Sequence, residues 1–193
     1  MTAQFDVTSL KGRLLSKAPP LQSLEKNLEV ASVAIVINPE DRGGSVLLIK
    51  RSERKGDPWS GQIGFPGGHK SPSDEGLLRT AIREAEEEVG IDLAQHQLLG
   101  ALPLVTTRSR TVQVAPFVFA LEFMVTVRVN REVDEIFWAP LAQLSRLEPK
   151  RREVHVKEGS LEVPCYDYHG HIIWGLTFRI ISLLLGRSFD GEW

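Results

Sequence analysis

The order of strand-like and helix-like segments agrees with an α/β fold class for this chain of 193 residues. Residues 30–38 and 45–51 form short, nearly continuous apolar runs rich in β-branched residues, which is typical of buried strands. Residues 71–89 instead repeat apolar side chains with the period of an amphipathic helix. Further strand-like segments follow, so strands are expected on both sides of this helix in the sequence.

The first 29 residues are expected to form an accessory segment ahead of a domain that spans residues 30–193. Leucines at helical spacing predict a short amphipathic helix that ends at Pro19 and Pro20, and a second helix after it; these leucines are Leu10, Leu14 and Leu15, then Leu21, Leu24 and Leu28. Two roles stay open for this segment, namely covering one side of the core or making contact in a homodimer.

The two apolar runs, 30–38 and 45–51, are expected to pair as antiparallel strands because turn-forming residues 39–44 separate them. A polar loop follows and leads into a glycine-rich stretch at Gly67 and Gly68. Beyond the helix, residues 98–105, 112–121 and 123–129 have β character. A short helix is expected from about Pro140, a hairpin from residues 151–156 and 160–165, and a closing helix after Trp174.

The helix has recognisable ends. Ser71 can cap its N-terminus, with Pro72 at the first helical position and Asp74 three residues after the cap. Gly90 is placed to end the helix in a left-handed conformation. A buried stripe is predicted between these ends from Leu78, Ala81, Ile82, Ala85 and Val89.

Three carboxylates share another face of this helix. Glu84, Glu87 and Glu88 stand at positions i, i+3 and i+4, where each close pair of like charges costs about 0.2–0.5 kcal/mol. They also lie late in the helix, where its dipole favours cations. A hard divalent cation would compensate this repulsion, whereas the alternative interpretation is an ordinary solvated acidic face.

The residues around this face of the helix resemble the sequence signature of a known protein family. Glu75, Arg83, Glu84, Glu87, Glu88, Gly90 and Ile91, preceded by Gly67 and Gly68, resemble the Nudix hydrolase signature G-x5-E-x7-R-E-U-x-E-E-x-G-U over residues 65–91, where U is a bulky aliphatic residue. The sequence departs from the pattern at two points. Ala85 is small at a U position, and six residues rather than five separate Gly68 from Glu75.

This resemblance implies a Nudix-type α/β/α sandwich with a mixed β-sheet, and hydrolysis of a phosphoanhydride with Mg²⁺ or Mn²⁺ as cofactor. It assigns Glu84 and Glu88 as the main metal ligands, with the Gly68 carbonyl as a further ligand. Glu87 would share the metal or help to deprotonate the water, and Arg83 would orient Glu87. The resemblance further implies structural support from Glu75, Gly67 and Gly90.

The segment before the helix is similar to the motif of the coenzyme A pyrophosphatase branch, L-L-T-x-R-S followed by a later arginine and G-x3-F-P-G-G. Here the residues read L-L-I-K-R-S and G-Q-I-G-F-P-G-G, with Ile49 in place of threonine and Gly56 at the later arginine position. This similarity implies coenzyme A or its derivatives as substrate and Arg51 as a substrate-binding residue. Lys50, Arg54 and Lys55 can also grip a phosphate or form an ordinary basic surface loop.

Several assignments stay open at this level. Glu132 and Glu135 are alternatives to Glu87 as general base, and Trp59 and Phe117 can stack on a base or pack in the protein. The alternative substrates are ADP-ribose, nucleoside diphosphate sugars and nucleoside triphosphates. A non-catalytic nucleotide-binding module is the alternative outside the enzyme class.

The amino-acid composition limits the kinds of partner and the cellular setting expected for this chain. The net charge of −2 gives no basic footprint for nucleic acid, and no apolar run approaches the length needed to span a bilayer. The single cysteine, Cys165, fits a reducing, cytoplasmic setting, and no secretion signal opens the chain.

Overall fold

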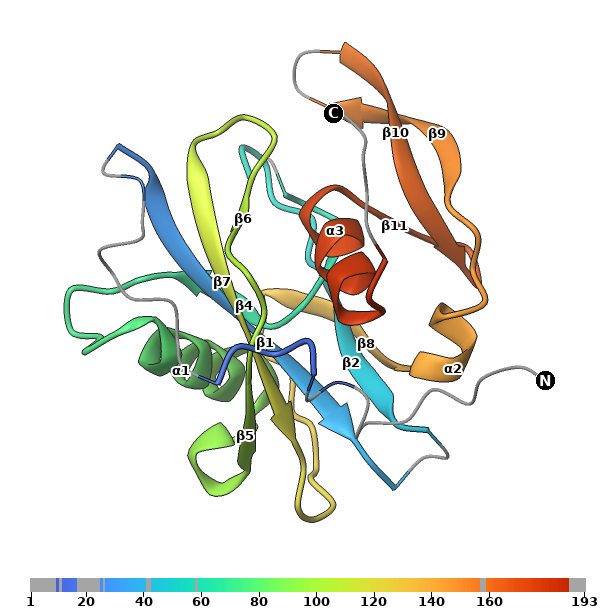
Figure 1. The fold of residues 1–193 in the computed structure, drawn as a ribbon. Coiled ribbons are helices and arrows are strands. Elements are labelled where there is room, and N and C mark those ends of the chain that lie inside the picture. The colour runs from blue at the N-terminus through green and yellow to red at the C-terminus, as the bar shows by residue number, and fades with distance from the viewer. Residues whose placement is uncertain are drawn as a thin grey trace.

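The computed structural model describes residues 10, 12–16, 25, 27–40, 43–57, 59–156 and 159–187. These residues form a mixed eight-stranded sheet with helices on both faces, and a separate three-stranded antiparallel sheet beyond one of those helices (Figure 1). The α/β sandwich expected from the sequence is therefore confirmed. In the described part of the chain, no helix is long and apolar enough to cross a membrane.

The larger sheet has the order β3-β2-β1-β7-β5, with β8 beside β2, β4 beside β1 and β6 beside β7. Its strands are β1 (Glu29–Asn38), β2 (Ser45–Arg51), β3 (Ile63–Gly64), β4 (Gly67–His69), β5 (Gln97–Ala101), β6 (Val105–Thr106), β7 (Val112–Ala120) and β8 (Val133–Pro140). β1 and β7 pair in parallel, and the other pairs of this sheet are antiparallel. The antiparallel pairing of β1 and β2 is as predicted.

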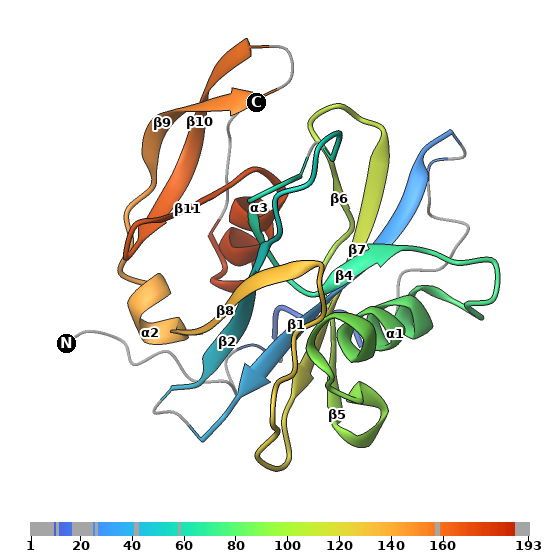
Figure 2. The same ribbon diagram turned by 180° about the vertical axis from the view of Figure 1, so that it is seen from behind.

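Strand β1 is buried on both faces, which explains its continuous apolar sequence. Ala34 and Val36 pack on one face, in a cluster with helix α1 (Leu77–Val89). Ile35 and Ile37 pack on the other face, in a cluster with helix α3 (Gly175–Leu184). Figure 2 shows the two helices on opposite sides of the sheet when the molecule is seen from behind.

Helix α1 begins later than predicted. Its N-cap is Gly76, and Ser71 does not cap it. The Ser71 N–H instead donates to the Asp74 carboxylate at 2.8 Å, which holds residues 71–74 as a separate turn. The predicted end is confirmed, because Gly90 caps the helix with φ of 70°.

The buried stripe of α1 is confirmed in part. Ala81, Ala85 and Val89 are buried, whereas Leu78 and Ile82 are half-buried.

Two of the expected strands differ in the structure. The segment 98–105 divides into β5 and β6, separated by residues 102–104. The segment 123–129 forms no strand, because its backbone pairs with the end of helix α1 instead of a sheet edge. There the Arg128 N–H donates to the Val89 carbonyl at 2.9 Å, and the Asn130 N–H donates to the Glu88 carbonyl at 3.1 Å.

The C-terminal elements follow the prediction. Helix α2 (Leu141–Leu144) follows β8, and β9 (Lys150–Val156) and β10 (Gly159–Tyr168) form the expected hairpin. Strand β11 (His171–Trp174) completes the three-stranded sheet and leads directly into α3.

The N-terminal segment is described only in part. Residues 12–16 form a turn and an isolated bridge from Leu15 to Ala101 rather than the predicted helix. Leu10 is fully buried in the cluster on the α3 side, and Leu14 packs against that cluster. Of the second predicted helix, Leu21 and Leu24 lie outside the described residues, whereas Leu28 is described and lies in a bend.

Candidate active site

The glycine-rich loop is placed by strand β4, in which Gly67 and Gly68 pair with Val33 and Ser32 of β1. A Cβ atom on Gly67 would lie 2.8 Å from the Val33 Cα atom, and one on Gly68 would lie 2.6 Å from the Glu84 carboxyl carbon. Real Cβ atoms do not approach other atoms so closely. Gly67 is therefore needed for this loop to pack against β1, and the absence of a side chain at Gly68 leaves room for the Glu84 carboxylate.

Arg83 is the centre of the polar contacts at this face. Its guanidinium donates to both oxygens of Asp74 at 3.1 and 3.0 Å, and to the His69 carbonyl at 3.1 Å. It also donates to Glu84 Oε1 at 2.8 Å and to Glu87 Oε2 at 3.1 Å. The expected contact between Arg83 and Glu87 is thus present, and Arg83 ties the loop to the helix.

Glu88 is the most deeply buried of the three signature carboxylates, with 3% of its side chain exposed. Its Oε2 atom accepts from the Gly67 N–H at 2.9 Å, and its Oε1 atom lies 3.6 Å from Arg51. Burial raises the pKa of Glu88 to about 7, although the Gly67 N–H and Arg51 act in the opposite direction. The charge of ionised Glu88 is therefore incompletely compensated by the protein.

Glu84 and Glu87 differ in their surroundings. The side chain of Glu84 is 14% exposed and that of Glu87 is 56% exposed. Burial raises the pKa of Glu84 even though Arg83 opposes the effect. Ionisation of Glu84 and of Glu88 thus costs free energy in the absence of a further cation.

The carboxylate oxygens of Glu84, Glu87 and Glu88 are chemically suited to bind a hard divalent cation. Within the described residues, hydrogen bonds engage only one oxygen each of Glu84, Glu87 and Glu88, which leaves one oxygen of each for a further ligand. Carboxylate oxygens are the ligands that Mg²⁺ and Mn²⁺ take. The same residues hold no group of three or more acidic, histidine or cysteine side chains that already converge on one point. Ion binding would therefore draw these side chains together.

Arg51 reaches the acidic face from the end of strand β2. Its guanidinium lies 3.1 Å from Asp57 and 3.6 Å from Glu88, and its Nε atom is buried without a hydrogen-bond partner among the described residues. A buried donor without an acceptor costs free energy, so Arg51 has an unused site for an anionic ligand. Strand β2 pairs with β1 at Ile37–Asn38, whereas β4 pairs with β1 at Ala31–Val33, so the two strands diverge beside this residue.

The other basic residues of the loop do not reach Glu88. Lys50 lies 3.5 Å from Asp134, Arg54 lies 3.1 Å from Glu132, and Lys55 is exposed.

Glu132 and Glu135, the alternative candidates for the general base, lie in different surroundings. The charge of Glu132 raises the pKa of both Glu84 and Glu88, so it faces the acidic group. Glu135 instead lies 3.4 Å from His171 of the three-stranded sheet. The structure thus places Glu132, but not Glu135, beside the signature carboxylates.

Asp74 is a residue that the sequence prediction missed. It is 6% exposed and accepts hydrogen bonds from Arg83, Ser71 and Thr80, and the Arg83 bond is the main reason that its pKa falls to about 2. Glu75 is exposed and makes no such contact among the described residues. The signal was available, because five residues separate Gly68 from Asp74, whereas seven residues separate Glu75 from Arg83.

The two aromatic candidates also differ. Phe117 is 1% exposed within the cluster under α1, so the core interpretation is confirmed for it. Trp59 is 38% exposed, and its ring lies 6.2 Å from that of His69 at the end of the glycine loop.

Comparison with known proteins identifies the family. Residues 28–157 match the model of the NUDIX domain. This chain belongs to the Nudix family. Nudix hydrolases act on pyrophosphate bonds and generally use divalent metals such as Mg²⁺ or Mn²⁺.

Two relatives agree with this assignment. The chain is 35% identical over 172 residues to a protein of Photorhabdus laumondii named Uncharacterized Nudix hydrolase NudL, covering 88% of this chain and 90% of that protein. It is 33% identical over 147 residues to the mitochondrial coenzyme A diphosphatase NUDT8 of Mus musculus, covering 73% and 69%.

Among solved structures, the fold is similar to a MutT/nudix family protein from Enterococcus faecalis. That match has a TM-score of 0.52 at 17% identity and covers 86% of this chain and 63% of that chain. A C. elegans Ap4A hydrolase in a binary complex matches with a TM-score of 0.50 at 20% identity, covering 57% and 80%. At these identities the likeness concerns the fold alone.

Proposed function

We propose that this Nudix protein is a divalent-metal-dependent pyrophosphohydrolase that cleaves coenzyme A or its derivatives into an adenosine diphosphate and a phosphopantetheine. The observation that carries the metal-dependent part is the pair of carboxylates, half-buried Glu84 and buried Glu88, whose pKa values are raised by burial. The coenzyme A part is supported by the relative NUDT8, named a coenzyme A diphosphatase, and by Arg51 at the corresponding motif position.

In this proposal Glu84, Glu87 and Glu88 hold the cation, with the Gly68 carbonyl as a further ligand. A bound divalent cation supplies neutralisation of phosphate charge and a lowered pKa for bound water. Arg83 fixes the positions of Glu84 and Glu87 through its hydrogen bonds, and Asp74 fixes Arg83. Positioning of this kind is a large part of catalysis in phosphoryl transfer, because the reacting oxygens must lie in line.

Arg51 is proposed to bind the diphosphate, since a planar guanidinium matches phosphate oxygens and its Nε atom has no partner among the described residues. We expect Arg51→Lys to raise KM about tenfold for every diphosphate substrate, while Lys55→Arg, at an exposed residue of the following loop, leaves it unchanged. Glu87 and Glu132 remain the proposed candidates for the residue that takes the proton from water. A pH–rate profile that loses its acidic limb in only one of Glu87→Gln and Glu132→Gln would identify that residue.

The deciding experiment offers the purified protein, with Mg²⁺ or Mn²⁺, a panel of coenzyme A, ADP-ribose, diadenosine polyphosphates and nucleoside triphosphates. Mass spectrometry of the products should show phosphopantetheine from coenzyme A at the highest kcat/KM of the panel. Preferred turnover of another member would replace the coenzyme A assignment. Tight binding without turnover of any member would instead indicate a non-catalytic nucleotide-binding module.

A further inference from the structure

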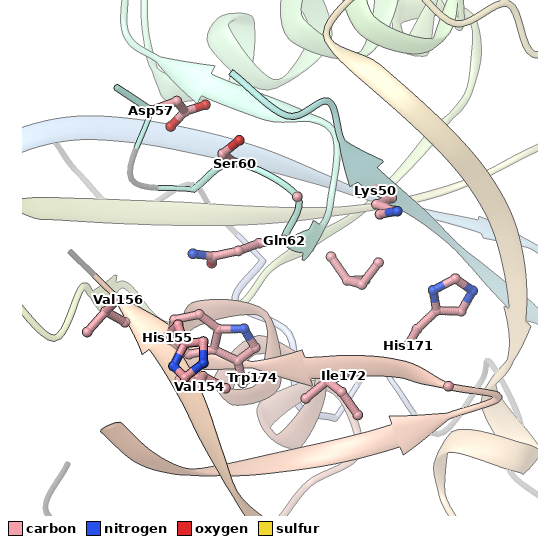
Figure 3. Close-up of a pocket in the computed structure, with 13 residues that line it drawn as sticks. Lys50, Asp57, Ser60, Gln62, Val154, His155, Val156, His171, Ile172 and Trp174 are labelled. Carbon is pink, nitrogen blue, oxygen red and sulfur yellow. The ribbon is translucent and has the colours of Figure 1, made fainter. Parts of the chain in front are cut away.

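A pocket of about 490 Å³ lies outside the acidic site, between the loop that joins β2 to β3 and the three-stranded sheet. Figure 3 shows Lys50 and Gln62 on the side of the β2–β3 loop, and His155, Ile172 and Trp174 on the opposite side. Pockets of roughly 300–1,000 Å³ are typical of small-molecule sites. None of the signature residues lines this one.

One residue connects the pocket to the acidic site. Asp57 lines the pocket and also accepts a hydrogen bond from Arg51 at 3.1 Å, and the same guanidinium lies 3.6 Å from Glu88. A substrate whose diphosphate is held at Arg51 therefore has this pocket on the far side of Asp57. The pocket is in position for whatever group the diphosphate carries.

The charges of the lining indicate that this group is uncharged. Lys50 lies 3.5 Å from Asp134, His171 lies 3.4 Å from Glu135, and Asp57 is paired with Arg51. A second phosphate would have to compete with three carboxylates for these partners. An uncharged group meets no such competition.

The remaining lining suits a chain with both polar and apolar parts. Ser60 and Gln62 provide hydrogen-bonding side chains, while Ile172 and Trp174 provide apolar surface. On strand β9, the half-buried Val154 and Val156 add to that surface, since alternate residues of a strand face the same side.

We propose that this pocket holds an elongated, uncharged chain of amide, hydroxyl and methylene groups attached to the diphosphate of the substrate. The inference rests on the proposed function, because in coenzyme A such a chain is the pantetheine arm. The pocket would then distinguish coenzyme A from nucleotides whose second moiety is shorter or charged.

The test compares two substrates, coenzyme A and an analogue in which a methyl group replaces the pantetheine arm on the same diphosphate. Val154→Trp, which fills the pocket, should lower kcat/KM for coenzyme A about tenfold or more, chiefly through KM, and leave the methyl analogue unchanged. Glu153→Trp is the matched control, because the exposed Glu153 lies on the opposite face of the same strand. Ile172→Glu, which places a charge in the pocket from β11, serves as a second variant.

Calorimetric titration with free pantetheine gives a readout that is independent of turnover. Pantetheine should bind to the wild type and to Glu153→Trp but not to Val154→Trp or Ile172→Glu. This result supports the inference even if the protein hydrolyses no member of the substrate panel. Coenzyme A kinetics that are identical in all four proteins would overturn the inference while leaving the proposed function intact. Failure of pantetheine to bind the wild type at millimolar concentration would overturn it as well.

Discussion

Replacement of Glu88 by glutamine tests whether this carboxylate is kept for function at the expense of stability. The amide keeps an oxygen that can accept from the Gly67 N–H, but it carries no charge. Because Glu88 is buried and, among the described residues, only Gly67 and Arg51 compensate its charge, we expect the variant to be more stable than the wild type in the absence of metal and above neutral pH. We expect its turnover to fall by about 100-fold or more, since a bound metal contributes several kcal/mol to catalysis.

The magnitude follows from the pKa of Glu88, which is raised from 4.5 to about 7 in the folded protein. One pKa unit corresponds to about 1.4 kcal/mol, so ionisation of Glu88 costs the fold roughly 3 kcal/mol. The folded state holds the proton more tightly, so the contribution of Glu88 to stability is complete below pH 4.5 and is lost as the pH rises through 7. Most of this loss, roughly 2 kcal/mol, falls between pH 5 and pH 8.

The assay is urea unfolding followed by tryptophan fluorescence, with a chelator present, at pH 5 and at pH 8. The free energy of unfolding of Glu88→Gln, relative to the wild type, should rise by roughly 2 kcal/mol between these two pH values. Glu86→Gln is the control, because Glu86 is exposed on the same helix and should show no such change. Added Mn²⁺ should stabilise the wild type and remove the advantage of Glu88→Gln. A difference that does not change with pH would refute the argument that Glu88 is undercompensated.

Two further substitutions test the loop around this site. Asp74→Asn should lower the free energy of unfolding by roughly 2 kcal/mol at pH 7, as measured by urea unfolding. The reason is that Arg83 lowers the pKa of Asp74 from 3.8 to about 2 in the folded protein. The stabilisation by ionised Asp74 is present above pH 3.8 and is lost as the pH falls through 2. Glu75→Gln should stay near the wild type, since Glu75 is exposed. Gly68→Ala should lower Mn²⁺ affinity and turnover by about 10- to 100-fold, because its Cβ atom would displace the carboxylate that packs against it. Gly76→Ala is the control, with open space around the added atom, and equal calorimetric Mn²⁺ titrations for the two alanine variants would contradict this prediction.

The features predicted correctly from the sequence are those that depend on neighbouring residues. The period of α1, its end at Gly90 and the β9–β10 hairpin all reflect local spacing and turn chemistry. The start of α1 was wrong because Asp74 is engaged by Arg83, nine residues away, and this contact draws residues 71–74 into a turn. Such a contact competes with helix capping and leaves no local pattern.

The segment 123–129 is a second case in which the sequence pattern alone gave the wrong local structure. Its β-branched residues fit a strand, but β propensity is realised only where a neighbouring strand offers free backbone groups. The carbonyls at the end of α1 take up the N–H groups of Arg128 and Asn130 instead. This pairing places the following loop, with Glu132, beside the signature carboxylates. The sequence named Glu132 and Glu135 as equal candidates, and only the tertiary structure separates them.

The contact between Arg51 and Glu88 spans 37 residues and could not be predicted from spacing, yet it decides how the molecule is organised. Arg51 is held from one side by Asp57, which lines the pocket, and from the other by Glu88, the most buried carboxylate of the helix. Hydrogen bonds from the Trp59 N–H and Arg51 outweigh burial and lower the pKa of Asp57, so it stays ionised and keeps its hold on the guanidinium. The guanidinium of Arg51 therefore lies between the pocket and the acidic face. In the proposed function, that position joins recognition of the substrate to the site of the chemistry through a single side chain.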